Sequence, residues 1–235
     1  MTSTAQYNGS LQYAVDIVLC IDITGSMHPV LDSVKGSALL FRERLEAAMQ
    51  EKGKAISQLR IKVIAFRDFG DFADDAIQET GFFVFPDEAA EFKDFVSGLD
   101  ADGGGDAPES GLEALALAIH TDWERGLDRR RHVIAMFTDA PAHPLGSPAA
   151  VTAHNYPQQI PRSMDELSEQ WGYTRSQTAL MDNSAKRLVL FAPDLSPWSE
   201  ISEEWNRAIY FPSKAGHGLE ELEMDEIIET IANSL

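Results

Sequence analysis

The sequence from Tyr13 to Met27 reads YAVDIVLCIDITGSM, an apolar segment followed by three oxygen-bearing side chains. The run AVDIVLCI is short and apolar, which favours a buried strand that ends at Asp22. Asp22, Thr24 and Ser26 lie at alternate positions, with Gly25 between the two hydroxyl residues. If the chain turns after Asp22, these side chains face one point, and Gly25 lets the backbone come close. The segment therefore predicts a strand whose carboxyl end presents oxygen atoms to a ligand.

Strand patterns and helix patterns alternate along the rest of the chain. Apolar strand patterns occupy 13–22, 59–66, 81–86, 132–139, 186–193 and 207–212. Helical patterns run from Leu31 to Ala48, over 87–99, from Leu112 to Trp123, onward from the capping-box pair Ser163 and Glu166, and over 219–235. This alternation predicts an α/β fold, a doubly wound and mostly parallel sheet of about six strands with helices on both faces. Ligands bind such a sheet at the carboxyl ends of its strands, near the switch in strand order.

The length and composition suit one domain in a reducing compartment. The chain has 235 residues, and we expect a polar N-terminal tail at 1–11 followed by one domain at 12–235. No apolar run approaches the ~18 residues of a membrane helix, and the N-terminus lacks a signal-peptide pattern. Cys20 is the single cysteine, so an intramolecular disulfide is impossible. We therefore expect a cytoplasmic protein that has no membrane partner.

The charge of the chain limits its partners further. The formal net charge is -19, which repels phosphate backbones and anionic lipid. The one basic cluster, Arg129 to Arg131, is too short to outweigh that repulsion. Nucleic-acid binding is therefore not expected, whereas basic partners or bound cations suit this composition.

Carboxylates follow two later segments as well. Asp106 comes directly after the triple glycine at 103–105, and Asp139 ends the strand pattern 132–139. Carboxylate and hydroxyl oxygens are hard ligands that suit Mg²⁺, Mn²⁺ or Ca²⁺. The sequence therefore predicts a divalent-metal site made by Asp22, Thr24, Ser26, Asp106 and Asp139.

Three motifs carry a resemblance to a known family. DITGS at 22–26, GGGDAPE at 103–109 and MFTDAPAH at 136–143, in this order, resemble the von Willebrand factor A (vWA) superfamily and its metal-ion-dependent adhesion site. The resemblance covers about 12–235 and is greatest to intracellular members, such as those joined to atypical kinases or found in bacterial gene clusters. It implies Asp22 as the first ligand, Thr24 and Ser26 as the hydroxyl ligands, and Asp139 as a carboxylate that usually holds the metal through water.

The same resemblance implies a fold detail and a function. It places one antiparallel strand, 81–86, at the edge of the sheet, and the gap before it, 67–80, lacks a helical period and favours a hairpin-like return. The implied function is a metal-dependent protein-binding module, not an enzyme, that acts as an intracellular adaptor in a signalling or remodelling assembly. The Pro-rich loop 141–161 lies beside the predicted site and is expected to help choose the partner protein.

One alternative belongs to a different class of protein. DITGS also resembles the nucleophile loop of haloacid-dehalogenase-type phosphotransferases, in which Asp22 would attack a phosphoryl group. The acidic motif GDFADD at 70–75 follows the second strand rather than the last, and Lys186 opens its strand instead of ending one. The binding module is therefore the preferred interpretation.

Several site residues have a simpler interpretation. Asp22 and Ser26 suit a turn before a helix, and Asp106 suits a helix N-cap with Pro108 and Glu109 in the first turn. His143 lies just past Asp139, and Asp68 and Asp71 follow the strand pattern 59–66. Each of them either lies beside the metal site or is an ordinary loop residue.

Asp106 also changes the predicted charge of the site. It stands where the family usually has threonine, so the site would hold three carboxylates against one divalent ion. A water, hydroxyl or carbonyl oxygen is then expected at the open position rather than a carboxylate.

Overall fold

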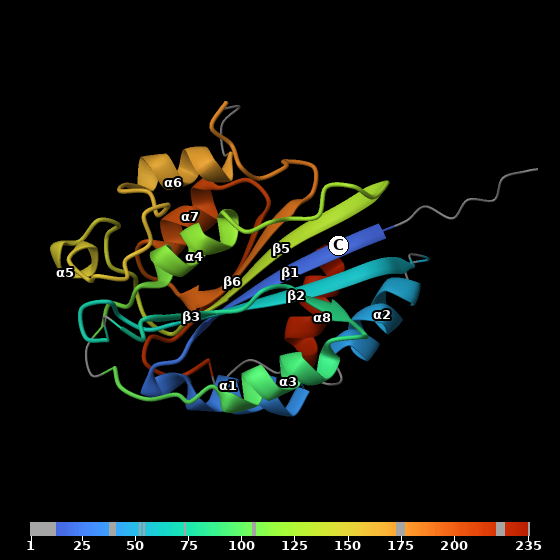
Figure 1. Cartoon of the computed structure of the whole chain (residues 1–235), viewed down its shortest axis with the longest axis horizontal. Helices are drawn as coiled ribbons and strands as arrows, with labels where there is room; N and C mark the ends of the chain where they lie inside the picture. Colours follow the sequence, from blue (N-terminus) through green and yellow to red (C-terminus); the bar gives the residue numbers. More distant parts are fainter. Residues whose placement is uncertain are drawn as a thin grey trace, which may run out of the picture.

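The computed structural model describes residues 13–37, 41–51, 53, 55–72, 74–104, 107–172, 177–219 and 224–234. Its centre is a seven-stranded sheet with helices on both faces (Figure 1). The strands are β1 (Tyr13–Asp22), β2 (Ile56–Phe66), β3 (Ile77–Glu79), β4 (Phe83–Phe85), β5 (Arg129–Phe137), β6 (Lys186–Pro193) and β7 (Ala208–Ser213). The order is β3-β2-β1-β5-β6-β7, and β4 also pairs with β2. The predicted doubly wound α/β fold is confirmed.

The helices divide between the two faces of the sheet. They are α1 (His28–Ser37), α2 (Phe41–Glu51), α3 (Ala89–Gly98), α4 (Gly111–Ile119), α5 (Pro148–Val151), α6 (Met164–Trp171), α7 (Trp198–Glu204) and α8 (Met224–Ser234), with the 3-10 turn η1 (Gly25–Met27) before α1. One face carries α1, α2, α3 and α8, and the other carries α4, α6 and α7 (Figure 1). No helix within the described ranges is long and apolar enough to cross a membrane.

The central strand β1 is buried on both faces because its side chains alternate between two cores. Val15, Ile17 and Leu19 pack into the core under α1, α2, α3 and α8, whereas Val18 and Cys20 pack into the core under α4, α6 and α7. Burying each such aliphatic side chain contributes about 1.5–3 kcal/mol. The continuous apolar run in the sequence is therefore the consequence of two-sided burial.

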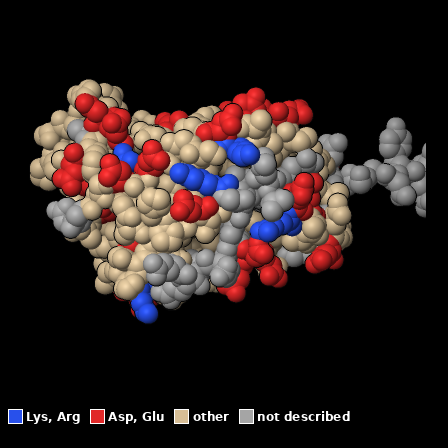
Figure 2. Space-filling view, turned by 90° about the horizontal axis from the view of Figure 1, so that it is seen from below, with Lys and Arg blue, Asp and Glu red and all other residues tan. Residues whose placement is uncertain are grey.

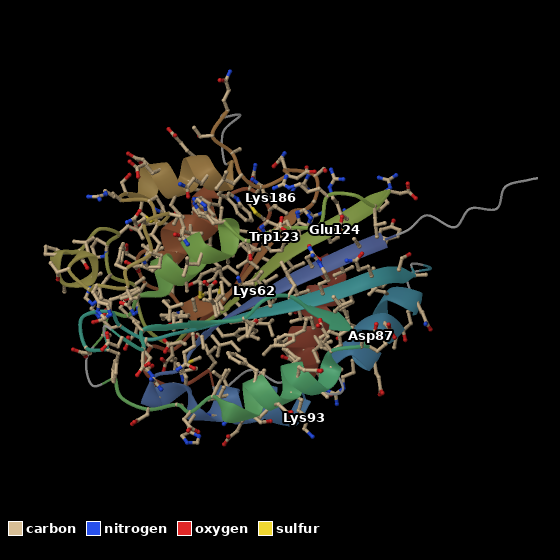
Figure 3. All side chains as sticks on the ribbon, viewed as in Figure 1. Lys62, Asp87, Lys93, Trp123, Glu124 and Lys186 are labelled. Carbon is tan, nitrogen blue, oxygen red and sulfur yellow. The ribbon has the colours of Figure 1, made fainter. Side chains whose placement is uncertain are left out.

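One buried charge inside β1 has hydrogen-bond partners of its own. Asp16 is fully buried, and Arg60 on β2 donates to its two carboxylate oxygens at 2.8 and 2.6 Å. The main-chain N–H of Glu124 donates to Asp16 at 2.7 Å, so the α4–β5 connection is attached to the sheet. Trp123 and Glu124 lie together above the sheet in Figure 3, and the Trp123 ring stacks on His132 at 5.0 Å. A buried ion pair with these extra hydrogen bonds is strongly destabilising to break.

The two edges of the sheet are formed by different kinds of strand. On one edge β3 and β4 each pair antiparallel with β2 over three residues. On the other edge β7 pairs in parallel with β6, and Leu188 N–H donates to the carbonyl of Arg207. Because main-chain groups alternate in a parallel ladder, Pro212 lies on the side of β7 away from β6.

The structure corrects several predicted boundaries. The predicted single antiparallel strand 81–86 is present as β4, but β3 adds a second antiparallel strand that the sequence analysis missed. The helix predicted from Leu31 to Ala48 is two helices, α1 and α2. Trp123 lies beyond the end of α4 and is buried in the following loop. The loop 141–161 contains the short helix α5.

Two capping predictions have different outcomes. Ser163 caps α6, since its hydroxyl accepts a hydrogen bond from the Glu166 N–H at 3.2 Å. The N-cap interpretation of Asp106 is wrong in its spacing: α4 begins at Gly111, so Pro108 and Glu109 precede the helix instead of forming its first turn. Asp106 itself and the tail 1–11 lie outside the described residues.

Candidate functional site

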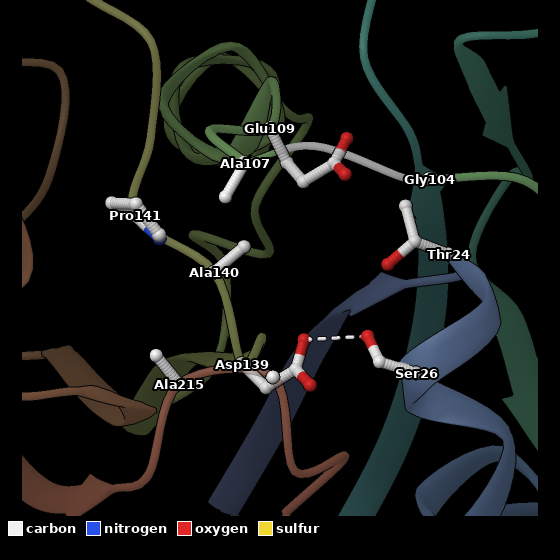
Figure 4. Close-up of a pocket in the computed structure, with 10 residues that line it drawn as sticks. Thr24, Ser26, Gly104, Ala107, Glu109, Asp139, Ala140, Pro141 and Ala215 are labelled. Carbon is white, nitrogen blue, oxygen red and sulfur yellow. Dashed lines mark hydrogen bonds between the residues drawn. The ribbon is translucent and has the colours of Figure 1, made fainter.

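The predicted strand ends meet where the order of the sheet reverses. β1 lies between β2 and β5, and its last residue is Asp22, while Asp139 follows the end of β5 by two residues. A pocket of about 230 Å³ opens at this edge and is lined by Thr24, Ser26, Gly104, Ala107, Glu109, Asp139, Ala140, Pro141, Ala215 and Gly216. Figure 4 shows Thr24 and Ser26 on one side of this pocket, facing Asp139. The structure thus brings together oxygen atoms from two parts of the chain.

Asp22 lies fully buried beneath the pocket. Its Oδ1 accepts hydrogen bonds from the Thr24 N–H at 2.9 Å and the Thr24 hydroxyl at 2.6 Å, and its Oδ2 accepts from the Thr138 hydroxyl at 2.7 Å. Burial raises the pKa of Asp22 to about 6, and the hydrogen bonds from Thr24 and Thr138 counter part of that effect. A cation bound beside Asp22 would favour its ionised form.

Asp139 is held by a different loop. The Ser26 hydroxyl donates to Asp139 Oδ1 at 2.9 Å, and the Gly218 N–H donates to Oδ2 at 2.7 Å. The Gly216 N–H also donates to the Asp139 carbonyl at 2.9 Å. Gly218 has a φ of 59°, and a Cβ there would come within 2.1 Å of the Ser26 carbonyl oxygen. The segment before α8 therefore closes against the DITGS loop, and a larger residue at 218 would prevent this.

Gly104 lines another side of the pocket. The Gly25 N–H donates to the Gly103 carbonyl at 2.8 Å, which joins the segment at Gly103 and Gly104 to the loop after β1. Gly104 has a φ of 70°, and a Cβ there would lie 2.8 Å from the Thr24 Cβ. The close approach of the two loops thus depends on a glycine at 104.

Glu109 is a pocket residue that the sequence analysis did not place there. Its side chain is 4% exposed, and its carboxylate points across the pocket toward Thr24 and Gly104 (Figure 4). Its N–H donates to the Pro141 carbonyl at 2.9 Å, and its carbonyl accepts from the His143 N–H at 2.9 Å. These two bonds fix Glu109 against the loop after β5. The sequence offered the acidic motif GGGDAPE but no local sign of which acid enters the pocket.

The other candidates, Asp68, Asp71 and His143, lie in the loops after β2 and β5. Asp68 accepts a hydrogen bond from the Ser110 hydroxyl at 3.1 Å and lies 3.4 Å from His143 Nε2. Asp71 is exposed in the turn after β2. None of Asp68, Asp71 and His143 lines the pocket.

The described donors suit a hard cation but not a thiolate or imidazole site. No group of three His, Cys, Asp or Glu side chains within the described ranges is arranged to hold a metal ion by itself. The oxygen atoms available at the pocket come from Asp22, Asp139 and the hydroxyls of Thr24 and Ser26, and Glu109 faces them from another wall (Figure 4). Mg²⁺, Mn²⁺ and Ca²⁺ accept such mixed oxygen sets and complete them with water.

Another buried carboxyl lies on α4, outside the pocket. Glu113 is fully buried, and the Tyr156 hydroxyl donates to its Oε1 at 3.3 Å. Among the described residues, its Oε2 has no hydrogen-bond partner. Burial raises the pKa of Glu113 to about 7, and the charge of Asp68 adds to this shift. Tyr156 belongs to the loop 141–161, so Glu113 joins that loop to α4.

The comparisons with known proteins concern the family and the fold of the chain. A family model of the von Willebrand factor A domain matches residues 16–161. The alpha-protein kinase vwkA of Dictyostelium discoideum is 28% identical over 155 residues, which is 65% of this chain and 23% of that kinase. The chain thus spans less than a quarter of the length of this curated relative.

The solved structures that resemble the chain include a pilus adhesin. SpaC of Lactobacillus rhamnosus GG in its open conformation superposes with a TM-score of 0.51 at 12% identity, over 96% of this chain and 30% of the adhesin. Another form of SpaC gives a TM-score of 0.54 at 11% identity, over 96% of this chain and 31% of the adhesin. At this identity the similarity shows the fold alone.

Proposed function

The chain belongs to the von Willebrand factor A domain family, and we propose that it is a protein-binding module that requires a divalent cation. Domains of this family are generally protein-interaction modules without enzymatic activity. The finer proposal is that Asp22, Thr24, Ser26 and Asp139 hold Mg²⁺, with Mn²⁺ or Ca²⁺ as alternatives. Asp106 remains part of this proposal from the sequence, and Glu109 joins it from the structure.

The observation that carries the proposal is the Ser26–Asp139 contact. These residues are 113 positions apart, yet the hydroxyl and carboxylate oxygens lie 2.9 Å apart at the mouth of the pocket. Thr24 is joined to Asp22 directly behind them at 2.6 Å. A divalent ion bound here would supply an open coordination position that accepts an oxygen atom from another protein. The chain's own role is to hold the carboxylates and hydroxyls in place before the partner arrives.

The proposed setting is an adaptor in a cytoplasmic signalling or remodelling assembly. The similarity to a protein named as a kinase supports a signalling context. The loop 141–161 starts at the pocket with Pro141 and includes Val151, whose side chain is 39% exposed. The loop therefore reaches the pocket at Pro141 and exposes an apolar side chain at Val151, and we propose that it contributes to partner choice.

The geometry disfavours the phosphotransferase alternative. Lys186 begins β6, and its ammonium donates to the carbonyls of Trp171 and Gly172 at 2.6 and 3.0 Å. It lies above the sheet near α6 (Figure 3). We therefore expect no Mg²⁺-dependent phosphomonoesterase activity; an activity that Asp22→Asn abolishes in a folded protein would support that alternative.

Metal binding provides the direct test of the proposal. Titration of Mn²⁺ followed by electron paramagnetic resonance is expected to show one site, and Mg²⁺ is expected to compete for it. Asp139→Asn is expected to weaken Mn²⁺ binding at least about 10-fold, because it removes a charge at the ion. Asp165→Asn makes the same charge change on the exposed side of α6 and serves as the control. Equal Mn²⁺ binding by both variants would refute the site.

A further inference from the structure

The pocket at the proposed metal site carries more negative charge than one divalent ion neutralises. Glu109 and Asp139 line it and Asp22 lies directly behind Thr24, so the described residues supply three carboxylates. One divalent ion leaves this group with a formal charge near minus one. This charge arises without Asp106, which lies outside the described residues.

No cationic side chain offsets this charge from within the pocket. None of the described residues that line it is Lys, Arg or His. Arg67 lies behind the DITGS loop, where its guanidinium donates to the carbonyls of Ile23 and Asp100 at 3.3 and 2.8 Å. Arg67 therefore does not line the space that a partner would enter.

The rest of the molecule adds to the negative electrostatic potential around the pocket. The chain carries 38 acidic and 19 basic residues, a net charge of -19. Figure 2 shows acidic side chains distributed over the lower face of the molecule, with basic side chains in a few places. A field of this sign accelerates association with a cationic partner and slows association with an anionic one.

From this charge distribution we infer that the partner is a basic peptide segment that offers a neutral oxygen, a hydroxyl or main-chain carbonyl, to the ion, and that Glu109 is the residue that selects it. The inference rests on the proposed metal-dependent function. Glu109 suits this role because it is 4% exposed, its main chain is fixed by Pro141 and His143, and its carboxylate faces the pocket (Figure 4). The remaining lining at Ala107, Ala140 and Ala215 is small, which lets a backbone approach closely.

The expected discrimination follows from one unit of charge. A unit charge about 4 Å away changes an affinity by up to roughly 1000-fold at the effective dielectric of a protein surface. Relaxation and salt screening that halve the interaction energy leave roughly 30-fold. The parent protein is therefore expected to bind a basic peptide at least ~30-fold more tightly than an acidic peptide of equal length. Glu109→Gln keeps the shape of the side chain and removes the charge, so it is expected to reduce that ratio by about 10-fold or more.

The experiment measures two quantities on the same samples. Mn²⁺ binding is followed by electron paramagnetic resonance. Fluorescence anisotropy measures the affinities of two labelled peptides of equal length, a basic one with a serine flanked by lysines and an acidic one with a serine flanked by glutamates. Glu203→Gln, an exposed position on α7, controls for the change in net charge. Ala215→Lys adds a cation on the exposed rim and is expected to improve binding of the acidic peptide.

The outcomes distinguish failure of the proposed metal-dependent function from failure of the inference about the partner. If the parent does not bind Mn²⁺, the proposed function fails. If it binds Mn²⁺ but prefers the acidic peptide, shows no metal-dependent binding of the basic one, or keeps its ratio in Glu109→Gln, the inference about the partner fails alone. A ratio that falls in Glu109→Gln and Ala215→Lys but not in Glu203→Gln supports it.

Discussion

Replacing Glu113 by glutamine is expected to stabilise the protein in a pH-dependent way. The carboxyl is fully buried on α4, and burial raises its pKa from 4.5 to about 7. At ~1.36 kcal/mol per pKa unit, this difference corresponds to about 3 kcal/mol. The folded chain binds the proton more tightly than the unfolded chain. This contribution is therefore complete below pH 4.5 and is lost as the pH rises through 7.

Glutamine keeps the shape of Glu113 and can still accept from the Tyr156 hydroxyl, but it cannot ionise. We therefore expect the stability of Glu113→Gln, relative to the parent, to rise by up to about 3 kcal/mol between acidic and alkaline pH. For a chain of this size, that equals roughly 6–12 °C in Tm at pH 8.5.

Urea unfolding followed by tryptophan fluorescence at several pH values measures this difference. Chelator is kept in every sample, so that the shifted pKa of Asp22 affects the parent and the variant equally. Glu203→Gln provides the matched surface substitution. A stability difference between Glu113→Gln and the parent that does not change with pH would refute the reasoning, and would mean that Glu113 is hydrated in the folded protein.

Three further predictions test other contacts. Gly104→Ala is expected to lower the free energy of unfolding by more than about 1 kcal/mol and to weaken Mn²⁺ binding, because its Cβ would lie 2.8 Å from that of Thr24. Gly53→Ala is the control, since Gly53 has a similar φ of 67° with open space around it. Equal effects of the two substitutions on Mn²⁺ binding would contradict the steric argument. Arg60→Ala is expected to cost about 3–5 kcal/mol in urea unfolding by leaving Asp16 buried without its partner, and a cost below about 1 kcal/mol would show that water enters there. Ser163→Ala is expected to cost about 1 kcal/mol in the same assay through loss of the α6 cap, and an unchanged stability would contradict that role.

The sequence predicted the parallel part of the fold because its central strands contain long apolar runs. Most of β1 and β6 and the C-terminal halves of β2 and β5 are buried, and that environment leaves a visible apolar run. β3 has no such pattern, since its three residues are stabilised by pairing with Ile64–Phe66 rather than by burial. Short edge strands of this kind depend on a partner elsewhere in the chain, so local reading misses them.

In the candidate site too, some residues could be predicted from the local sequence, whereas others are placed by contacts between distant parts of the chain. Asp22 and Asp139 were predictable as neighbours because the carboxyl ends of parallel strands meet at one edge of the sheet. Glu109 was assigned to a helix that begins two residues later, and its real position depends on an isolated bridge to Ala142. Thr138 was also missed, although it directly precedes Asp139 and donates to Asp22. Both omissions arise from contacts that a linear pattern does not contain.

The edge strands of the sheet also affect whether copies of this molecule can associate by strand pairing. A growing fibril or a swapped dimer needs an open ladder of amide and carbonyl groups. β7 presents Pro212 on that side, which removes a donor, and the opposite edge ends in strands of only three residues. Assembly by strand addition is thereby disfavoured even when the local concentration is high. A scaffold that incorporates many such modules can therefore crowd them together, with their loop ends available to partners and their sheets kept separate.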